Sequence, residues 1–170
     1  MSETDGKKIK ERPSAFDVAV KYLSVSPRSE KEVREKLYKK SYHKAEVEEA
    51  IARAKGYGYI DDEKYVEDFV DYYGAKTGRK QLEYKLVTEK GISVELARNG
   101  IADAISDEEE REKALTMGRK CALQKRISEK KELQKVGAFL YRRGFSRDVI
   151  DGVLNTLSDE LFNGSDDLTD

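Results

Sequence analysis

The apolar residues of this chain repeat with one spacing in three separate stretches, and this repetition limits what the chain can fold into. When Ser41 is aligned with Gly91 and Gly144, the apolar positions of the segments that follow coincide, at a period of about 50 residues. The coinciding positions are Val47, Ala50, Ile51 and Ala54, then Ala97, Gly100, Ile101 and Ala104, and finally Ile150, Val153, Leu154 and Leu157. Repetition at this length indicates an array whose units bury apolar side chains within themselves and against their neighbours.

Each repeat carries the signals of three helices. Apolar side chains recur three to four residues apart, and Ser29 and Ser106 each open a capping box with a glutamate three residues later. Ser128 is expected to open a further helix that carries Leu133 and Val136. The chain has only two prolines, so helices are rarely interrupted. We therefore predict an all-α fold, an elongated array of three tandem three-helix repeats with nine helices.

The boundaries of the repeats follow from the turn signals between them. We expect a disordered tail over 1–13, repeat one over 14–60, repeat two over 61–105, repeat three over 106–158 and an acidic disordered tail over 159–170. The two tails are polar and have almost nothing to bury.

The net charge of −1 conceals a strong segregation of charge along the chain. Residues 1–60 carry +4, 61–110 carry −7, 111–148 carry +8 and 149–170 carry −6. Blocks of one sign are typical of surfaces that meet a partner of the opposite sign, and solvated helix faces are the alternative.

Two groups of cations are candidates for binding an acidic protein surface or a phosphate backbone. The first surrounds Gly78, beside Tyr72 and Tyr73, which either stack on a partner or pack internally. The second lies in the +8 block, where Lys131, Lys135 and Arg142 are spaced to share one helix face. The candidate residues are Lys76, Arg79, Lys80, Arg119, Lys120, Lys125, Arg126, Lys131, Lys135, Arg142, Arg143 and Arg147.

No group of residues favours catalysis. His43, the single histidine, lies at a turn without a second histidine or cysteine nearby, so we expect neither a zinc site nor a general base. Cys121 is expected to be a small core residue, although Arg119 and Lys120 could lower its pKa. The acidic runs at 61–63 and 107–110 stand at helix starts, where capping explains them better than magnesium. We predict no enzyme, no metal and no cofactor.

The composition also bears on location. No apolar run approaches the ~20 residues of a membrane-spanning helix, and the N-terminal segment lacks the apolar region of a secretion signal. One cysteine cannot form an internal disulfide, which fits a reducing cytoplasm. We expect a cytoplasmic protein, monomeric and without membrane contact.

Four stretches of the chain carry a family resemblance in order and spacing, from about residue 15 to 157. They are Tyr22–Ser24 followed by Arg28–Val33 and Leu37, then GYIDDEKY from Gly58 with Phe69, then Gly78-Arg79 with Leu82, Leu86 and Lys90–Ile92, and last FLYRRGFS from Phe139 with Ile150. With these motifs the chain resembles the RecX family of recombination regulators.

The resemblance implies a curved array of three three-helix repeats and a function. The family members bind the filament that the RecA recombinase forms on single-stranded DNA. They restrain filament growth, strand exchange, ATPase and co-protease activity, which links them to homologous recombination, DNA repair and the SOS response. The alternative function is a helical DNA-binding protein that acts independently of RecA.

The chain departs from the family pattern at two places. Leu86 to Gly91 is one residue longer than the usual spacing, so we expect a distortion at the end of the fifth helix. Gly100 lies inside the sixth helix, where a glycine costs ~1 kcal/mol relative to alanine.

Overall fold

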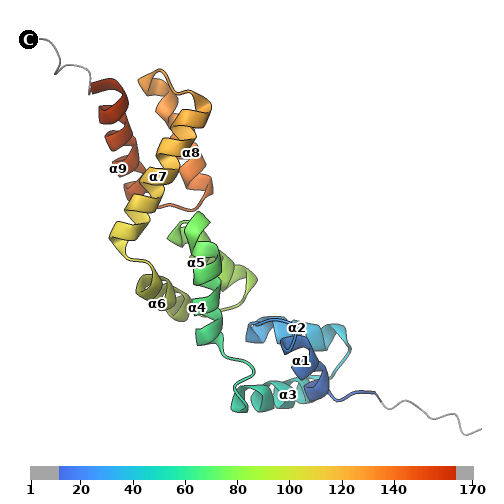
Figure 1. The fold of residues 1–170 in the computed structure, drawn as a ribbon. Helices are drawn as coiled ribbons and strands as arrows, with labels where there is room; N and C mark the ends of the chain where they lie inside the picture. Colours follow the sequence, from blue (N-terminus) through green and yellow to red (C-terminus); the bar gives the residue numbers. More distant parts are fainter. Residues whose placement is uncertain (1–11, 164–170) are drawn as a thin grey trace, which may run out of the picture. The chain divides into compact units, whose positions relative to one another are not determined.

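The structure, a computed structural model, describes residues 12–163, and within this range it contains nine α-helices, four short 3₁₀ or π turns and no strand (Figure 1). The all-α prediction is confirmed. Of the tails predicted over 1–13 and 159–170, residues 1–11 and 164–170 lie outside the described residues. The chain divides into two compact units, Met1–Asp61 and Asp62–Asp170. Among the described helices, none has both the length and the apolar composition that crossing a bilayer requires.

The first unit is a three-helix set that encloses its own core. Its helices are α1 (Ala15–Leu23), α2 (Glu30–Lys39) and α3 (Lys44–Gly56). Ser29 forms the predicted capping box with Glu32 at the start of α2. Val33 and Leu37 of α2 meet Val47 of α3, and all three side chains are fully buried. Burial of the aliphatic face therefore holds these helices together.

The second unit begins with another three-helix set. Its elements are α4 (Asp62–Tyr73), η1 (Gly74–Lys76), α5 (Arg79–Tyr84), η2 (Lys85–Glu89) and α6 (Val94–Ala104). Val66, Leu82 and Leu86 occupy the centre of its core. The apolar face predicted for α6 is shifted at its end, where Ala104 is exposed and Ile105 is buried instead.

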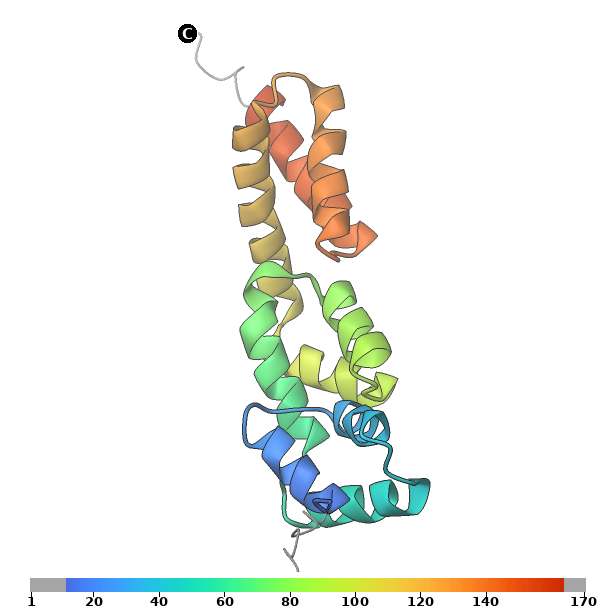
Figure 2. The ribbon, with the colours of Figure 1, turned by 90° about the vertical axis from the view of Figure 1, so that its right-hand side faces the viewer.

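The same unit continues with a third set, in which α7, α8 and α9 lie side by side in both views (Figures 1 and 2). Its elements are α7 (Asp107–Lys125), η3 (Lys130–Leu133), α8 (Gln134–Arg142), α9 (Arg147–Ser158) and η4 (Asp159–Asn163). The helix expected from Ser128 starts only at Gln134, after the 3₁₀ turn. Asp159–Asn163, expected in the disordered tail, instead forms a π turn whose Phe162 packs on the core.

The three sets repeat one another at the residue that ends their second helix. Ser41, Gly91 and Gly144 all adopt the left-handed conformation, with φ of 61°, 71° and 82°. The next residue is buried in each set, as Tyr42, Ile92 and Phe145. At Ser41 and Gly144 this geometry is the Schellman cap, in which a left-handed residue lets the chain satisfy the last helix carbonyls and turn back. Gly91 makes the same left-handed turn with a longer closure. The internal alignment read from the sequence is thus confirmed in the backbone.

The extra residue between Leu86 and Gly91 is accommodated by the π turn η2. The N–H of Tyr42 donates to Leu37 five residues earlier (3.3 Å), whereas the N–H of Ile92 donates to Leu86 six residues earlier (3.0 Å). A π turn absorbs one inserted residue without rotating the rest of the helix face. The distortion predicted at the end of the fifth helix is confirmed.

Close packing of α6 against α4 explains the glycine at position 100. A Cβ at this position would overlap the Val66 side chain of α4, so α6 crosses α4 at a distance that only glycine permits. The cost of a glycine within α6 is therefore tied to the close approach of the two helices.

Candidate interaction surface

The third helix set is built to expose cations at one end of α7. Ser106 caps the helix through its box with Glu109, and acidic residues fill the first turn, where the helix dipole stabilises them. The last turn and cap carry Lys125 and Arg126, and the negative end of the dipole favours cations there. The last turn and cap of α7 thus carry two exposed cations.

Six exposed cations of this set have no acidic partner among residues 12–163. One is Lys130 in η3, and the other five lie on α7 and α8 or at their C-terminal caps. We call these five the basic surface: Lys120, Lys125, Arg126, Arg142 and Arg143. The charges of Lys125 on α7 and Arg142 on α8 both favour a lower pKa of the Cys121 thiol. Burial nevertheless dominates and raises the pKa of Cys121, which is 4% exposed. The depressed pKa considered from the sequence is wrong, and Cys121 is a core residue as expected.

Four other predicted cations are neutralised by neighbouring carboxylates. Arg119 pairs with Glu160, and Arg147 lies 3.8 Å from Asp151. Lys131 and Lys135 each pair with a glutamate of their own turn, Glu129 at 2.7 Å and Glu132 at 2.6 Å. Lys135 and the backbone of Ser128 lower the pKa of Glu132 to about 2.

The helix face predicted for Lys131, Lys135 and Arg142 does not form. Lys131 lies in the 3₁₀ turn η3, before α8 begins, so it lacks the helical spacing that the sequence suggested. Arg142 is the one member of the three that the basic surface retains.

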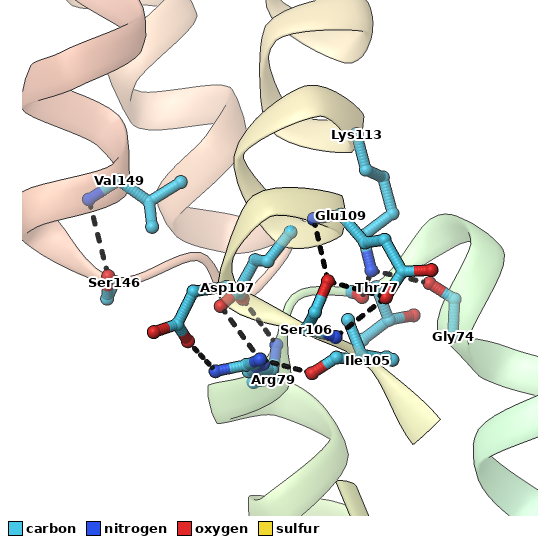
Figure 3. Close-up of polar contacts among 11 residues, drawn as sticks. Gly74, Thr77, Arg79, Ile105, Ser106, Asp107, Glu109, Lys113, Ser146 and Val149 are labelled. Carbon is cyan, nitrogen blue, oxygen red and sulfur yellow. Dashed lines mark hydrogen bonds and ion pairs between the residues drawn. The ribbon is translucent and has the colours of Figure 1, made fainter. Parts of the chain in front are cut away.

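Arg79 lies in a joint between the second and third helix sets (Figure 3). Its guanidinium donates to Asp107 at 2.5 Å and to the carbonyl of Ile105, and its side chain is only 25% exposed. Its backbone N–H donates to Glu110 at 2.9 Å. Lys76 and Lys80, the other two cations of this group, are exposed.

Further contacts close the same joint. Lys113 donates to the carbonyls of Gly74 (2.8 Å) and Thr77 (3.1 Å), and burial lowers its pKa. Gly78 and Gly144 meet backbone to backbone, with no room for a Cβ on either residue. The N–H of Gly78 donates to Arg143 at 2.7 Å. These contacts connect the two sets by backbone as well as side-chain hydrogen bonds.

The aromatic pair beside this joint divides between packing and exposure. The ring centroids of Tyr73 and Phe69 lie 4.5 Å apart, so Tyr73 packs on its own helix while 39% of it stays exposed. Tyr72 is 79% exposed.

The structure adds a residue to the surface that sequence reasoning did not select. Tyr141 is 74% exposed and lines a groove of about 400 Å³ between α8 and α9, next to Arg142 and Arg147. An exposed aromatic ring beside arginines suits stacking on a base or a protein side chain. Its position next to Arg142 in the sequence could have indicated that Tyr141 lies near the basic residues.

His43 lies at the start of a helix. It is the N-cap residue of α3, and its backbone N–H donates to Glu46 at 2.8 Å.

Comparison with known proteins agrees with this architecture. Residues 15–53 match the family model of the first three-helix domain of RecX, and residues 107–154 match that of its third three-helix domain. A crystal structure of RecX from Lactobacillus salivarius superposes with a TM-score of 0.76 at 28% identity, covering 85% of this chain and 94% of that one. A second crystal structure, of a regulatory protein RecX, shares the fold with a TM-score of 0.74 at 23% identity, covering 83% of this chain and 71% of that one.

Sequence relatives point the same way. The regulatory protein RecX of Bacillus velezensis is 30% identical over 141 residues, which cover 82% of this chain and 54% of the relative. That of Clostridium botulinum Eklund 17B is 30% identical over 151 residues, covering 86% of this chain and 70% of the relative. The chain thus spans little more than half the length of the Bacillus relative. With two domain models matched in order and this identity over most of its length, the chain belongs to the RecX family.

Proposed function

We propose that this chain is a non-enzymatic cytoplasmic regulator of RecA. It binds, as a monomer, in the groove of the RecA filament on single-stranded DNA and inhibits filament growth, ATPase, strand exchange and co-protease activity. Family membership supports the class of function. Through this restraint the chain limits homologous recombination, DNA repair and the SOS response.

The basic surface is the observation that carries the proposal. Its five cations are exposed without acidic neighbours in the described chain, as is Lys130 in η3. The remaining cations of the third helix set pair with carboxylates or, in the case of Lys113, donate to backbone carbonyls. Unpaired cations repel one another and so raise the free energy of the unbound chain. Binding to an acidic protein surface or a phosphate backbone would offset this repulsion. Exposed Tyr141 beside Arg142 adds a contact that is not electrostatic.

Lys76 and Lys80 extend the proposed contact, while Arg79 stands apart from it. Arg79 pairs with Asp107 and Glu110 in the joint. Its replacement would therefore disrupt the packing of the two helix sets, and any loss of partner binding could not be assigned to a direct contact.

The test is a titration of RecA ATPase on single-stranded DNA with the wild-type chain and with Lys125→Glu/Arg142→Glu. We expect the wild type to suppress ATPase at or below stoichiometric amounts and the variant to need about tenfold more protein, because reversed charges repel the partner. The control is Lys39→Glu/Lys44→Glu, which changes the net charge equally on the first unit and leaves the basic surface intact. Equal suppression by wild type and variant would move the interface elsewhere.

The same proteins distinguish the alternative function, DNA binding without RecA. A mobility shift on bare single-stranded DNA, with a salt slope near −0.7 for each phosphate contacted, would favour that function if RecA ATPase were unaffected. The exposed position of Tyr141 among arginines is the feature that keeps this alternative open.

A further inference from the structure

A groove between α4 and α6 combines an apolar floor with an acidic rim. It has a volume of about 440 Å³, and Val66, Leu96, Gly100 and Ala104 form its floor. Its rim is formed by Glu63, Glu67 and Asp71 of α4 and by Asp103 of α6. Among residues 12–163, no lysine or arginine lines the groove.

The rim carboxylates are almost free of internal cations. Glu67 lies 3.3 Å from Lys64, and in the part of the chain that the structure describes no cation contacts Glu63, Asp71 or Asp103. Glu63, Glu67 and Asp71 follow one another at four-residue spacing on α4, where like charges destabilise an isolated helix. The repulsion among these three carboxylates therefore lowers the stability of α4 and would be offset by a bound cationic partner.

The groove recurs in the next repeat. Under the alignment of Gly91 with Gly144, Leu96, Asn99, Gly100 and Asp103 correspond to Val149, Gly152, Val153 and Thr156. Those four residues line the groove between α7 and α9, whose opposite side carries Glu108 and Glu112. Its volume is about 220 Å³, and it also holds Arg111, which pairs with Glu108. The groove is thus a feature of the repeat, and its α4–α6 copy is larger and more acidic.

We propose that the α4–α6 groove docks a lysine- or arginine-rich segment of a partner protein, one that also offers a small aliphatic side chain to the floor. Charge complementarity selects this occupant. Nucleic acid is disfavoured, because its phosphates would face the rim carboxylates. A single metal ion is disfavoured as well, since no group of three or more His, Cys, Asp or Glu within residues 12–163 is close enough to hold one.

This docking surface is separate from the basic surface and does not rest on the proposed function. The basic surface lies on α7 and α8 and suits an acidic partner, whereas the groove lies on α4 and α6 and suits a basic one. A protein with both would hold partners of opposite charge, or two parts of one partner.

The test measures binding of a fluorescent peptide of repeating Leu-Lys-Ala-Lys units to the full chain by anisotropy, without RecA or DNA. We expect binding that weakens with added salt and that Asp71→Lys/Asp103→Lys weakens about tenfold, because two attractive charges become repulsive. Glu35→Lys/Glu49→Lys makes the same change of net charge on exposed positions of the first unit and should leave binding within about twofold of wild type.

A second variant tests the floor without changing charge. Ala104→Trp places a large side chain in the groove from the end of α6, and we expect it to weaken peptide binding at least about fivefold. Circular dichroism checks that each variant keeps its helices.

Three results would overturn the proposal. One is equal binding by wild type, Asp71→Lys/Asp103→Lys and Ala104→Trp. Another is an equal loss in the Glu35→Lys/Glu49→Lys control, which would mean attraction to net charge only. The third is salt-sensitive self-association, detected by sedimentation and abolished by Asp71→Lys/Asp103→Lys, which would make a second copy of this chain the occupant.

Discussion

Arg79 and Glu110 make two contacts across the joint of the second and third helix sets. The Glu110 carboxylate accepts the backbone N–H of Arg79 at 2.9 Å, and its other oxygen lies 3.4 Å from Nε of the same residue. Glu110 is 5% exposed, so this carboxylate is almost removed from water. One acidic side chain in the first turn of α7 thus accepts a hydrogen bond from the start of α5 and forms an ion pair with the Arg79 guanidinium, whose Nε has no hydrogen-bond partner within residues 12–163.

Replacing Glu110 by alanine should destabilise the second unit by about 2–3 kcal/mol. The change leaves the Arg79 N–H without its acceptor and removes one of the two carboxylates beside this partly buried cation, which keeps Asp107. Glu108→Ala is the matched control, because Glu108 lies in the same turn, is largely exposed and pairs only loosely with Arg111, at 3.6 Å. Its effect should stay within about 0.5 kcal/mol. Urea unfolding followed by circular dichroism measures both, and equal losses would contradict the assigned role of Glu110.

The capping boxes and left-handed caps could be predicted from the sequence because their physics is local. Ser106 and Glu109 are three residues apart, so a short stretch of sequence contains both partners of the interaction. Arg79 shows the limit. Its acidic partners Asp107 and Glu110 lie 28 and 31 residues away, so the residues near Arg79 in the sequence do not indicate this pairing. From the sequence alone, a cation that pairs with carboxylates of another helix set is therefore indistinguishable from a free cation that binds a partner.

The basic face predicted around Lys131 failed for a related reason. The apolar spacing predicts a helix from Ser128, but the chain makes a 3₁₀ turn before α8 begins at Gln134. Glu132 stabilises that turn by accepting the backbone N–H of Ser128 at 3.0 Å, four residues earlier. Side chain to backbone bonds of this kind compete with the start of a helix, and the apolar period alone does not show them.

Ser41→Gly should stabilise the first unit by about 0.5–1 kcal/mol. Ser41 holds φ of 61° at the position where the other two repeats have glycine, and a Cβ is strained in that conformation. The reverse change, Gly144→Ser, should cost more than Ser41→Gly gains, since its Cβ would also overlap Gln81 of α5. Thermal unfolding compares the two. A loss of stability in Ser41→Gly would show that the serine side chain stabilises this cap.

Deletion of Glu89 should be tolerated, with stability within about 1 kcal/mol of wild type. Glu89 is exposed and ends the π turn, so its removal lets α5 continue with ordinary helical bonds and restores the five-residue closure seen at Tyr42 and Phe145. Deletion of Glu49, also exposed but in the regular helix α3, should unfold the first unit, because it rotates the rest of α3 by about 100°. Circular dichroism distinguishes the folded from the unfolded variant. Unfolding of both variants would show that the π turn is not simply one inserted residue.

The Glu30 carboxylate should make the first unit sensitive to acid. Arg34 donates to it at 2.8 Å and Lys55 at 2.9 Å, and these bonds hold its pKa below the ordinary 4.5. A carboxylate whose pKa is lower in the folded state stabilises the fold above its unfolded pKa and loses that contribution as pH falls through the folded value. Because both cations remain partly exposed, the contribution is about 1 kcal/mol.

Glu30→Gln should therefore destabilise the first unit by about 1 kcal/mol near neutral pH and by almost nothing once the pH is well below 4.5. Hydrogen exchange at the buried amides of Val33 and Leu37 measures this unit separately from the rest of the chain. Glu49→Gln, on the exposed face of α3, should leave those exchange rates unchanged at every pH. A difference between wild type and Glu30→Gln that persists undiminished in acid would mean that the amide fits the site poorly for reasons other than charge.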